Sequence, residues 1–220
     1  MSLMFSVLGL GFLLGLRHAT DADHIAAITT FVSREQSIRT ATRIGVLWGI
    51  GHSASVTLVA IPVILFSLTL PPKLGLGFEF FVGVMLVALG LATIIIHSHT
   101  HQHKSHQTHT HEHVHFLGLF HTIRPLIVGL VHGLAGSAAI TLLVLSTIKD
   151  PRLSIVYLLI FHFGVISGMM LITTAFGTTV ILIKKKSESI HKYLIFASGV
   201  FSLAFGLYIM YQTGMLFSAV

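Results

Sequence analysis

The sequence contains no cysteine, and only 9% of its 220 residues are charged. Without cysteine, the chain can form neither a disulfide nor a thiolate metal site. A soluble domain of this size needs far more charge to cover its surface, so this composition and a mean hydropathy of +0.90 indicate an integral membrane protein. The net charge of +6 comes from cations placed between apolar spans, which does not indicate nucleic-acid binding.

Six apolar spans are long enough to cross a bilayer, where only helices or closed barrels satisfy the backbone. They cover roughly residues 3–32, 43–69, 76–96, 124–147, 153–182 and 193–215. Helix-breaking and charged residues separate these spans, for example Pro71 and Pro72. We therefore predict an all-α, polytopic membrane protein with six transmembrane helices.

Lys and Arg side chains predict how these helices are oriented. If both termini lie outside, the inner connections hold nine of these cations, whereas the outer ones hold three: Lys73, Lys149 and Arg152. Cytoplasmic loops carry the excess of Lys and Arg. We therefore expect a multi-pass protein of the cell inner membrane, with its N- and C-termini outside.

Short motifs recur in order at spacings of 114 to 116 residues. They are GLRH at 15–18 with GLVH at 129–132, WGI at 48–50 with FGV at 163–165, and GV at 83–84 with GV at 199–200. This pattern predicts two three-helix repeats, residues 1–96 and 124–220, and the odd helix number requires them to be inverted. The alternative is that glycine-rich packing faces of membrane helices simply look alike.

A polar, histidine-rich connection, residues 97–123, separates the two halves. Residues 97–115 of this connection hold nine histidines: His97, His99, His101, His103, His106, His109, His111, His113 and His115. Such a tract is predicted to be a mobile cytoplasmic loop, either a solvated linker or a loose metal-capturing segment. The pattern HExxH at 111–115 is not interpreted as a protease motif, because that motif needs a stable helix.

The stretch RHATDADHI, residues 17–25, places two imidazoles and two carboxylates inside an apolar span. Ionisable side chains at bilayer depth usually mark an ion pathway. We therefore predict that His18, Asp21, Asp23 and His24 bind a divalent cation, since imidazole and carboxylate are suitable ligands. Asp23 can join the site only if the helix is kinked or unwound near His18. The alternative is a structural ion-pair network that includes Arg17.

Three further histidines lie in other spans. His52, between glycines in the second span, is predicted to be a ligand or part of the ion pathway. His132 is a candidate because it is the repeat partner of His18. His162 is a weaker candidate, for which a hydrogen-bonded packing role is an equal alternative.

The stretch RHATDADHI resembles the RHAxDADHI signature of the nickel/cobalt transporter (NiCoT) family. Its His-x4-Asp-His core falls on His18, Asp23 and His24, and the GHS at 51–53 resembles the family's second histidine motif. No acid occurs over 131–139, where eight-helix members carry an acidic motif. The chain is therefore more similar to compact six-helix relatives, some labelled urease accessory proteins and others nickel/cobalt exporters.

The resemblance implies transport of Ni²⁺ or Co²⁺ as cargo, with no prosthetic group. The implied partners are the lipid bilayer, the metal ion and nickel-enzyme maturation proteins. Two alternatives are an intramembrane metalloenzyme and a membrane partner in metal sensing or urease assembly that does not transport. The enzyme alternative lacks an additional acid deep within the other spans to act as a base, since Glu79 lies at a span edge and Asp150 lies in a turn.

Deleting residues 97–115 and bridging the gap with a Gly/Ser linker tests the role of the histidine tract. We expect normal membrane insertion and substantial transport at saturating metal, but weaker capture at low metal, because the tract lies outside the predicted helices. Metal uptake measured at both concentrations checks this. Loss of flux at saturating metal would instead make the loop part of the obligatory path.

Overall fold

The computed structural model describes residues 2–66, 71–98, 115–134, 145, 147–148 and 150–219. These residues form helices and no strands, which confirms the all-α prediction. The helices are α1 (Ser2–His18), α2 (Ala22–Val32), α3 (Ile38–Phe66), α4 (Pro72–Ser98), α5 (His115–Gly133), α7 (Pro151–Lys186) and α8 (Glu188–Ala219). Four of them, α3, α4, α7 and α8, are long and apolar enough to cross a membrane.

The first predicted span, residues 3–32, is not a single helix, because α1 ends at His18 and α2 begins at Ala22. Thr20 Oγ1 donates a hydrogen bond to the Arg17 carbonyl over 2.6 Å. Asp21 follows in an extended conformation, with φ −61° and ψ 147°, at the N-cap position of α2. Short polar side chains offer the backbone such alternatives to the helix, and here they interrupt an otherwise apolar span.

The fourth predicted span also differs from the structure. Helix α5 begins at His115, inside the segment that we predicted as a loop, and Pro125 lies within the helix. His97 likewise lies in α4, whereas the histidines from 99 to 113 lie outside the described residues. Residues 135–144 of the predicted span also lie outside them.

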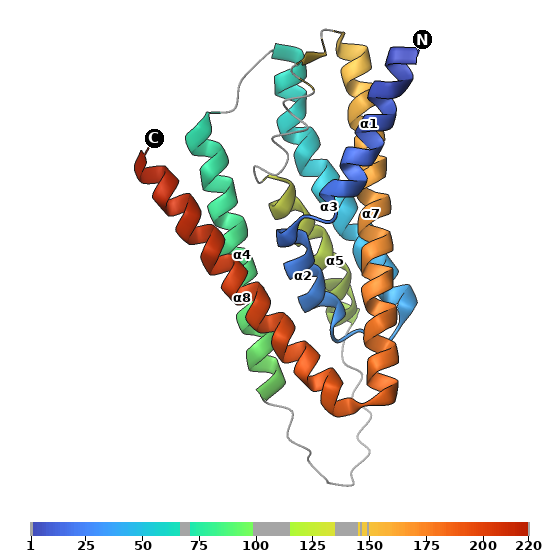
Figure 1. Cartoon of the computed structure of the whole chain (residues 1–220), viewed down its shortest axis with the longest axis vertical. Coiled ribbons are helices and arrows are strands. Elements are labelled where there is room, and N and C mark those ends of the chain that lie inside the picture. The colour runs from blue at the N-terminus through green and yellow to red at the C-terminus, as the bar shows by residue number, and fades with distance from the viewer. Residues whose placement is uncertain are drawn as a thin grey trace.

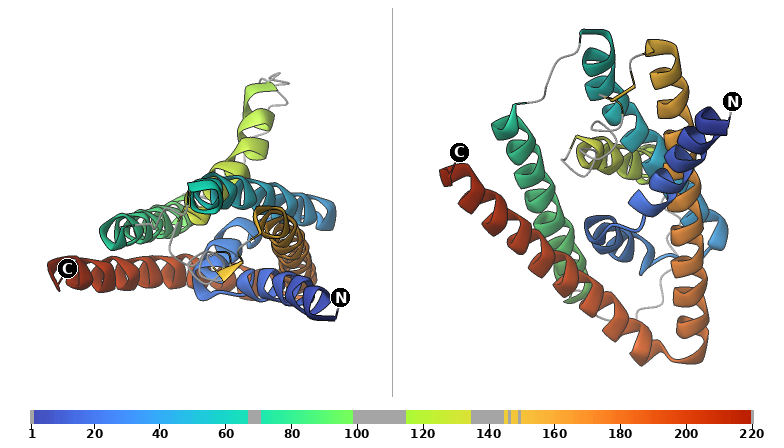
Figure 2. Two further views of the ribbon diagram at one scale, coloured as in Figure 1. Left: turned by 90° about the horizontal axis from the view of Figure 1, so that it is seen from above. Right: turned by 45° about the horizontal axis from the view of Figure 1, so that its top comes forward.

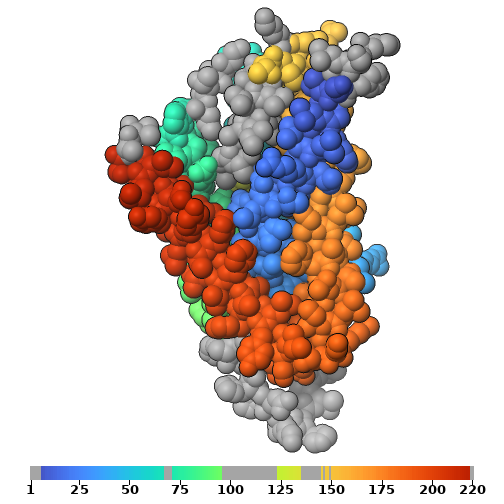
Figure 3. All heavy atoms as spheres, viewed as in Figure 1, coloured from blue at the N-terminus to red at the C-terminus, as the bar shows by residue number. Residues whose placement is uncertain are grey.

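The helices form two groups around the short helix α2 (Figure 1). In one group α1 packs on α7, α7 on α3, and α3 on α5, while in the other α4 packs along α8. The view from above shows α4 and α8 side by side (Figure 2). On one face the α1–α2 segment fills the space between α7 and α8 (Figure 3). Both chain termini lie at the same end of the molecule, opposite the α7–α8 turn.

Glycines allow the closest helix contacts. A Cβ atom added at Gly90 of α4 would lie 2.6 Å from the Gly199 carbonyl oxygen and 2.6 Å from the Leu203 nitrogen of α8. At Gly15 of α1 it would meet the Phe161 carbonyl of α7, and at Gly129 of α5 the Trp48 carbonyl of α3. Close backbone approach at small residues is how membrane helices associate without a hydrophobic driving force between them.

Gly90→Ala is therefore expected to destabilise the α4–α8 pair by about 1–3 kcal/mol, because the added methyl group overlaps the backbone of α8. Gly77→Ala is the matched control on the same helix, since a Cβ atom there meets nothing within 4 Å. Thermal unfolding of the two purified variants checks this. Equal melting temperatures would mean that the close contact is not needed.

Candidate metal site

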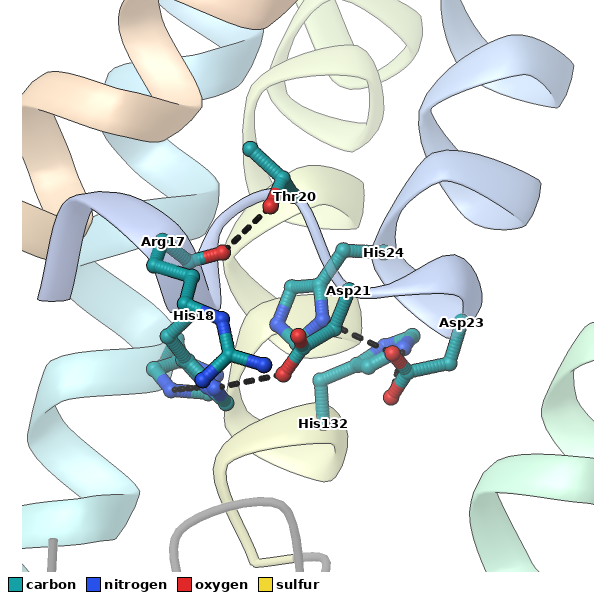
Figure 4. A network of polar contacts seen from close by, with 8 residues as sticks. Arg17, His18, Thr20, Asp21, Asp23, His24 and His132 are labelled. Carbon is teal, nitrogen blue, oxygen red and sulfur yellow. Dashed lines mark hydrogen bonds and ion pairs between the residues drawn. The ribbon is translucent and has the colours of Figure 1, made fainter. Parts of the chain in front are cut away.

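The break between α1 and α2 brings a network of polar side chains together among the helices (Figure 4). His18 ends α1 and His24 lies in the first turns of α2, so the break turns their rings toward one another, with centroids 4.8 Å apart. His52 of α3 joins them, with its ring 4.8 Å from that of His18. All three side chains are buried. The structure thus brings together three of the sequence-predicted site residues.

The ligating atoms of His18, His24 and His52 lie within 4.8 Å of one another. His18 Nε2 and His52 Nε2 are 3.0 Å apart. This contact is a hydrogen bond when His52 carries its proton on Nε2. When the proton is on Nδ1, two lone pairs face the same point, as they do around a bound cation.

The two aspartates hold the imidazoles in a fixed orientation. Asp21 Oδ2 lies 2.9 Å from His18 Nδ1, and Asp23 Oδ1 lies 3.0 Å from His24 Nδ1. A carboxylate only accepts hydrogen bonds, so each Nδ1 is the protonated nitrogen and each Nε2 keeps its lone pair. Carboxylate–histidine pairs of this kind orient ligands and raise their basicity at metal sites.

A second group of potential ligands overlaps the first. Asp23, His24 and His132 of α5 also have their ligating atoms within 4.8 Å of one another. Asp23 Oδ2 lies 3.6 Å from His132 Nε2, which is too long for a hydrogen bond. His132 is fully buried, and neither of its ring nitrogens has a hydrogen-bond partner.

Several buried nitrogen atoms at the site therefore have no hydrogen-bond partner in the described part of the chain. They are His24 Nε2, His52 Nδ1 and both nitrogens of His132. Leaving a buried polar atom unpaired costs about 1–3 kcal/mol, so such a concentration indicates a ligand-binding site. The alternative of an ion-pair network with Arg17 is not supported, because Arg17 is exposed and the described ion pairs of both aspartates are with histidines.

Aromatic rings border the site on one side. His24 stacks on Trp48, with centroids 5.8 Å apart and planes 14° apart. The ring centroids of Trp48 and Phe31 are 6.1 Å apart. The Arg124 guanidinium lies 4.9 Å from the Phe31 ring centre. Trp48 was not predicted as a site residue, although its position four residues before His52 on one helix face is a signal for it.

Beyond Phe31 lies a cavity of about 270 Å³ lined by residues of α2, α4, α5 and the start of α3. Arg34, in the α2–α3 connection, lies in its wall and donates a hydrogen bond to the Thr93 carbonyl. Burial lowers the pKa of Arg34, and the charge of Arg124 lowers it further. Arg34, Arg124 and Glu35 all line the cavity, so its wall carries two cations and one acid.

His162 belongs to neither group of ligands. Its Nε2 lies 2.8 Å from Thr57 Oγ1, which matches the packing role considered for it. Its Nδ1 is buried without a partner. The structure thus joins His132, but not His162, to the cluster predicted around His18.

Fold and site together define a multi-pass membrane protein with a buried histidine and aspartate cluster suited to a metal ion. Residues 4–197 match the NicO family, described as high-affinity nickel-transport protein. The chain is also 34% identical over 215 residues to the urease accessory protein UreH of Bacillus sp. (strain TB-90), covering 96% of this chain and 93% of that protein. No solved structure matches. The chain belongs to the NicO nickel-transport family, as the sequence motif predicted.

Asp21→Asn tests the orienting role of the carboxylates. Asparagine can present its NH₂ group to His18 Nδ1 and so favours the wrong tautomer, and we expect Ni²⁺ affinity to fall about tenfold. Asp150→Asn is the matched control, since Asp150 caps α7, a position where asparagine serves equally well. Titration of the purified proteins with Ni²⁺ checks this. Equal affinities would remove Asp21 from the site.

Proposed function

We propose that this protein carries a divalent transition metal ion, Ni²⁺ or Co²⁺, across the bilayer through a site formed by His18, His24 and His52. The observation that carries the proposal is the set of three buried imidazoles, each with a ring nitrogen within 4.8 Å of a ring nitrogen of the other two. In two of them a carboxylate on Nδ1 leaves Nε2 available as a ligand. Membership of a nickel-transport family supports the same cargo.

The spacing of the nitrogens fits such an ion. Imidazole nitrogens bind first-row ions at about 2.0–2.1 Å, so two of them at roughly a right angle are about 3 Å apart. His18 Nε2 and His52 Nε2 are 3.0 Å apart. Right-angled coordination is typical of Ni²⁺ in square-planar sites, whereas tetrahedral zinc sites separate their ligands more widely.

Asp21 and Asp23 then act on the ion mainly through the histidines. From the sequence alone, both aspartates are expected to be direct ligands. The hydrogen bonds to His18 and His24 favour an orienting role for Asp21, whose side chain is 39% exposed. Asp23 has a second oxygen directed at His132 and so keeps the capacity to bind an ion.

The helix packing supports six membrane passes in two inverted repeats. If α1 with α2 corresponds to α5, and α3 and α4 correspond to α7 and α8, then the α1–α7 contact has its counterpart in the α5–α3 contact. The α4–α8 pair follows the same relation. Gly83 meets Gly206 and Gly90 meets Gly199, and a shift of 116 positions between the repeats converts the first contact into the second. Inverted repeats place a transport site at their interface near the midplane, as proposed for His18 and His132.

The contacts favour a small change of register between the repeats. Gly51 packs against Leu126 and Leu130, and Gly164 packs against Phe12 and Leu16. The equivalent residues of α3 and α7 are then Gly51 and Gly164, which are 113 positions apart rather than the 115 inferred from the sequence motifs. His52 has Val165 as its counterpart, so the site is asymmetric.

The cation-rich end of the molecule is assigned to the cytoplasm. Seven of the eleven described Lys and Arg residues lie in the α2–α3 connection, the first turns of α3, the end of α7 and the start of α8, while both termini lie at the opposite end (Figure 1). By the positive-inside rule, we expect the termini outside and the histidine-rich connection, residues 97–123, in the cytoplasm. There the connection captures metal at the cytoplasmic entrance of the ion path.

A second candidate comes from the name of the relative, which is called a urease accessory protein. Urease is a nickel enzyme, so the ion handled here serves nickel-enzyme maturation, either by transport or by a sensing or assembly role without transport. A metalloenzyme is less well supported, because in the described part of the site each carboxylate contacts a histidine rather than standing free as a base.

Transport itself is tested in vesicles loaded or surrounded with Ni²⁺, so that flux is measured in both directions. His24→Gln and His52→Gln are expected to reduce flux to below about one tenth of the wild-type rate, because a buried ligand is lost. His162→Gln serves as the control for a buried histidine outside the site. Wild-type flux in His24→Gln, at normal membrane abundance, would remove the site from the pathway. Absence of flux in the wild-type protein would favour the non-transporting role.

A further inference from the structure

Two overlapping groups of ligands lie at this site, and they share His24. The second group replaces His18 and His52 with Asp23 and His132. We propose that the second group is a separate station on the ion path, to which the ion moves from the first station while His24 stays bound. This inference rests on the proposed transport function and adds a step to it.

His132 is the residue that the first station leaves unexplained. It is fully buried, and neither of its nitrogens has a hydrogen-bond partner among the described residues. Asp23 Oδ2 approaches its Nε2 to 3.6 Å. That separation exceeds a hydrogen bond, whereas two ligands that each lie about 2.1 Å from one ion are typically about 3–4 Å apart. The pair is therefore spaced to hold an ion between them.

The two oxygens of Asp23 serve the two stations separately. Oδ1 contacts His24 Nδ1 and orients that ring for the first station, while Oδ2 faces His132. An ion can thus exchange His18 and His52 for Asp23 and His132 one ligand at a time. It never has to return to water within the membrane, and neither station needs to bind so tightly that the ion cannot leave.

The stations also face different surroundings. In the first station, His18 is hydrogen-bonded to Asp21, whose side chain is partly exposed. The second borders Trp48, which meets the His132 ring edge-on at 5.4 Å and stacks on His24. Phe31 lies behind Trp48 and lines the cavity at the cation-rich end. The second station therefore leads toward that cavity, with Trp48 and Phe31 between them.

The test separates binding from flux in the full-length protein, with Ni²⁺ alone as the probe. His132→Gln is expected to bind Ni²⁺ in lipid nanodiscs with an affinity within about threefold of wild type, while flux in proteoliposomes at saturating Ni²⁺ falls about tenfold or more. X-ray absorption of the bound ion should show the same imidazole ligands as in the wild type. In His52→Gln it should show fewer imidazoles and a carboxylate oxygen, because the ion then occupies the second station.

His162→Gln is the matched control, and His132→Asn replaces His132→Gln if gel filtration shows that the latter misfolds. Wild-type flux in the His132 variant would overturn the second station. The proposed function would then still be decided separately by the flux of His52→Gln. If His132→Gln and His52→Gln both lose Ni²⁺ binding, the four histidines form one site, and the two-station path is also wrong.

Discussion

The break between α1 and α2 is the feature on which the rest of the site depends. On a regular helix Asp23 would point away from His18 and Asp21. Here Thr20 and Asp21 interrupt the helix, and the chain turns so that the rings of His18 and His24 face one another. Irregular backbone is tolerated at membrane depth only where protein or a polar cavity surrounds it. The helices around α2 provide these surroundings.

The hydrogen bonds of the two aspartates decide which imidazole nitrogens of His18 and His24 are free to bind a cation. Charged and polar groups at bilayer depth are costly unless they pair with one another. Asp21 and Asp23 each pair with an imidazole, and in doing so they determine which nitrogen of His18 and His24 is left for a cation. The contact with His24 thus lowers the cost of enclosing the Asp23 carboxylate, and the contacts of both aspartates orient the imidazoles.

Small residues next to the ligands bring the helices close enough to form the site. Gly15 lies three positions before His18 and packs on the α7 backbone, while Gly129 lies three positions before His132 and packs on α3. Gly51, adjacent to His52, packs on α5. Helices α1, α3 and α5 are therefore each in close contact with a neighbouring helix within one turn of the histidine that they contribute to the cluster, which limits how far these imidazoles can separate.

The sequence by itself determined the all-α membrane class, most of the apolar spans and the cluster around His18 and His24, because hydropathy and the signature over residues 17–25 are local. It also identified His52 and, through the repeat, His132. Only the tertiary structure decided that the first span breaks, that Trp48 stacks on His24, and that Asp21 orients His18. These depend on contacts between residues distant in sequence and on competition between side chains and the helical backbone, neither of which periodicity records.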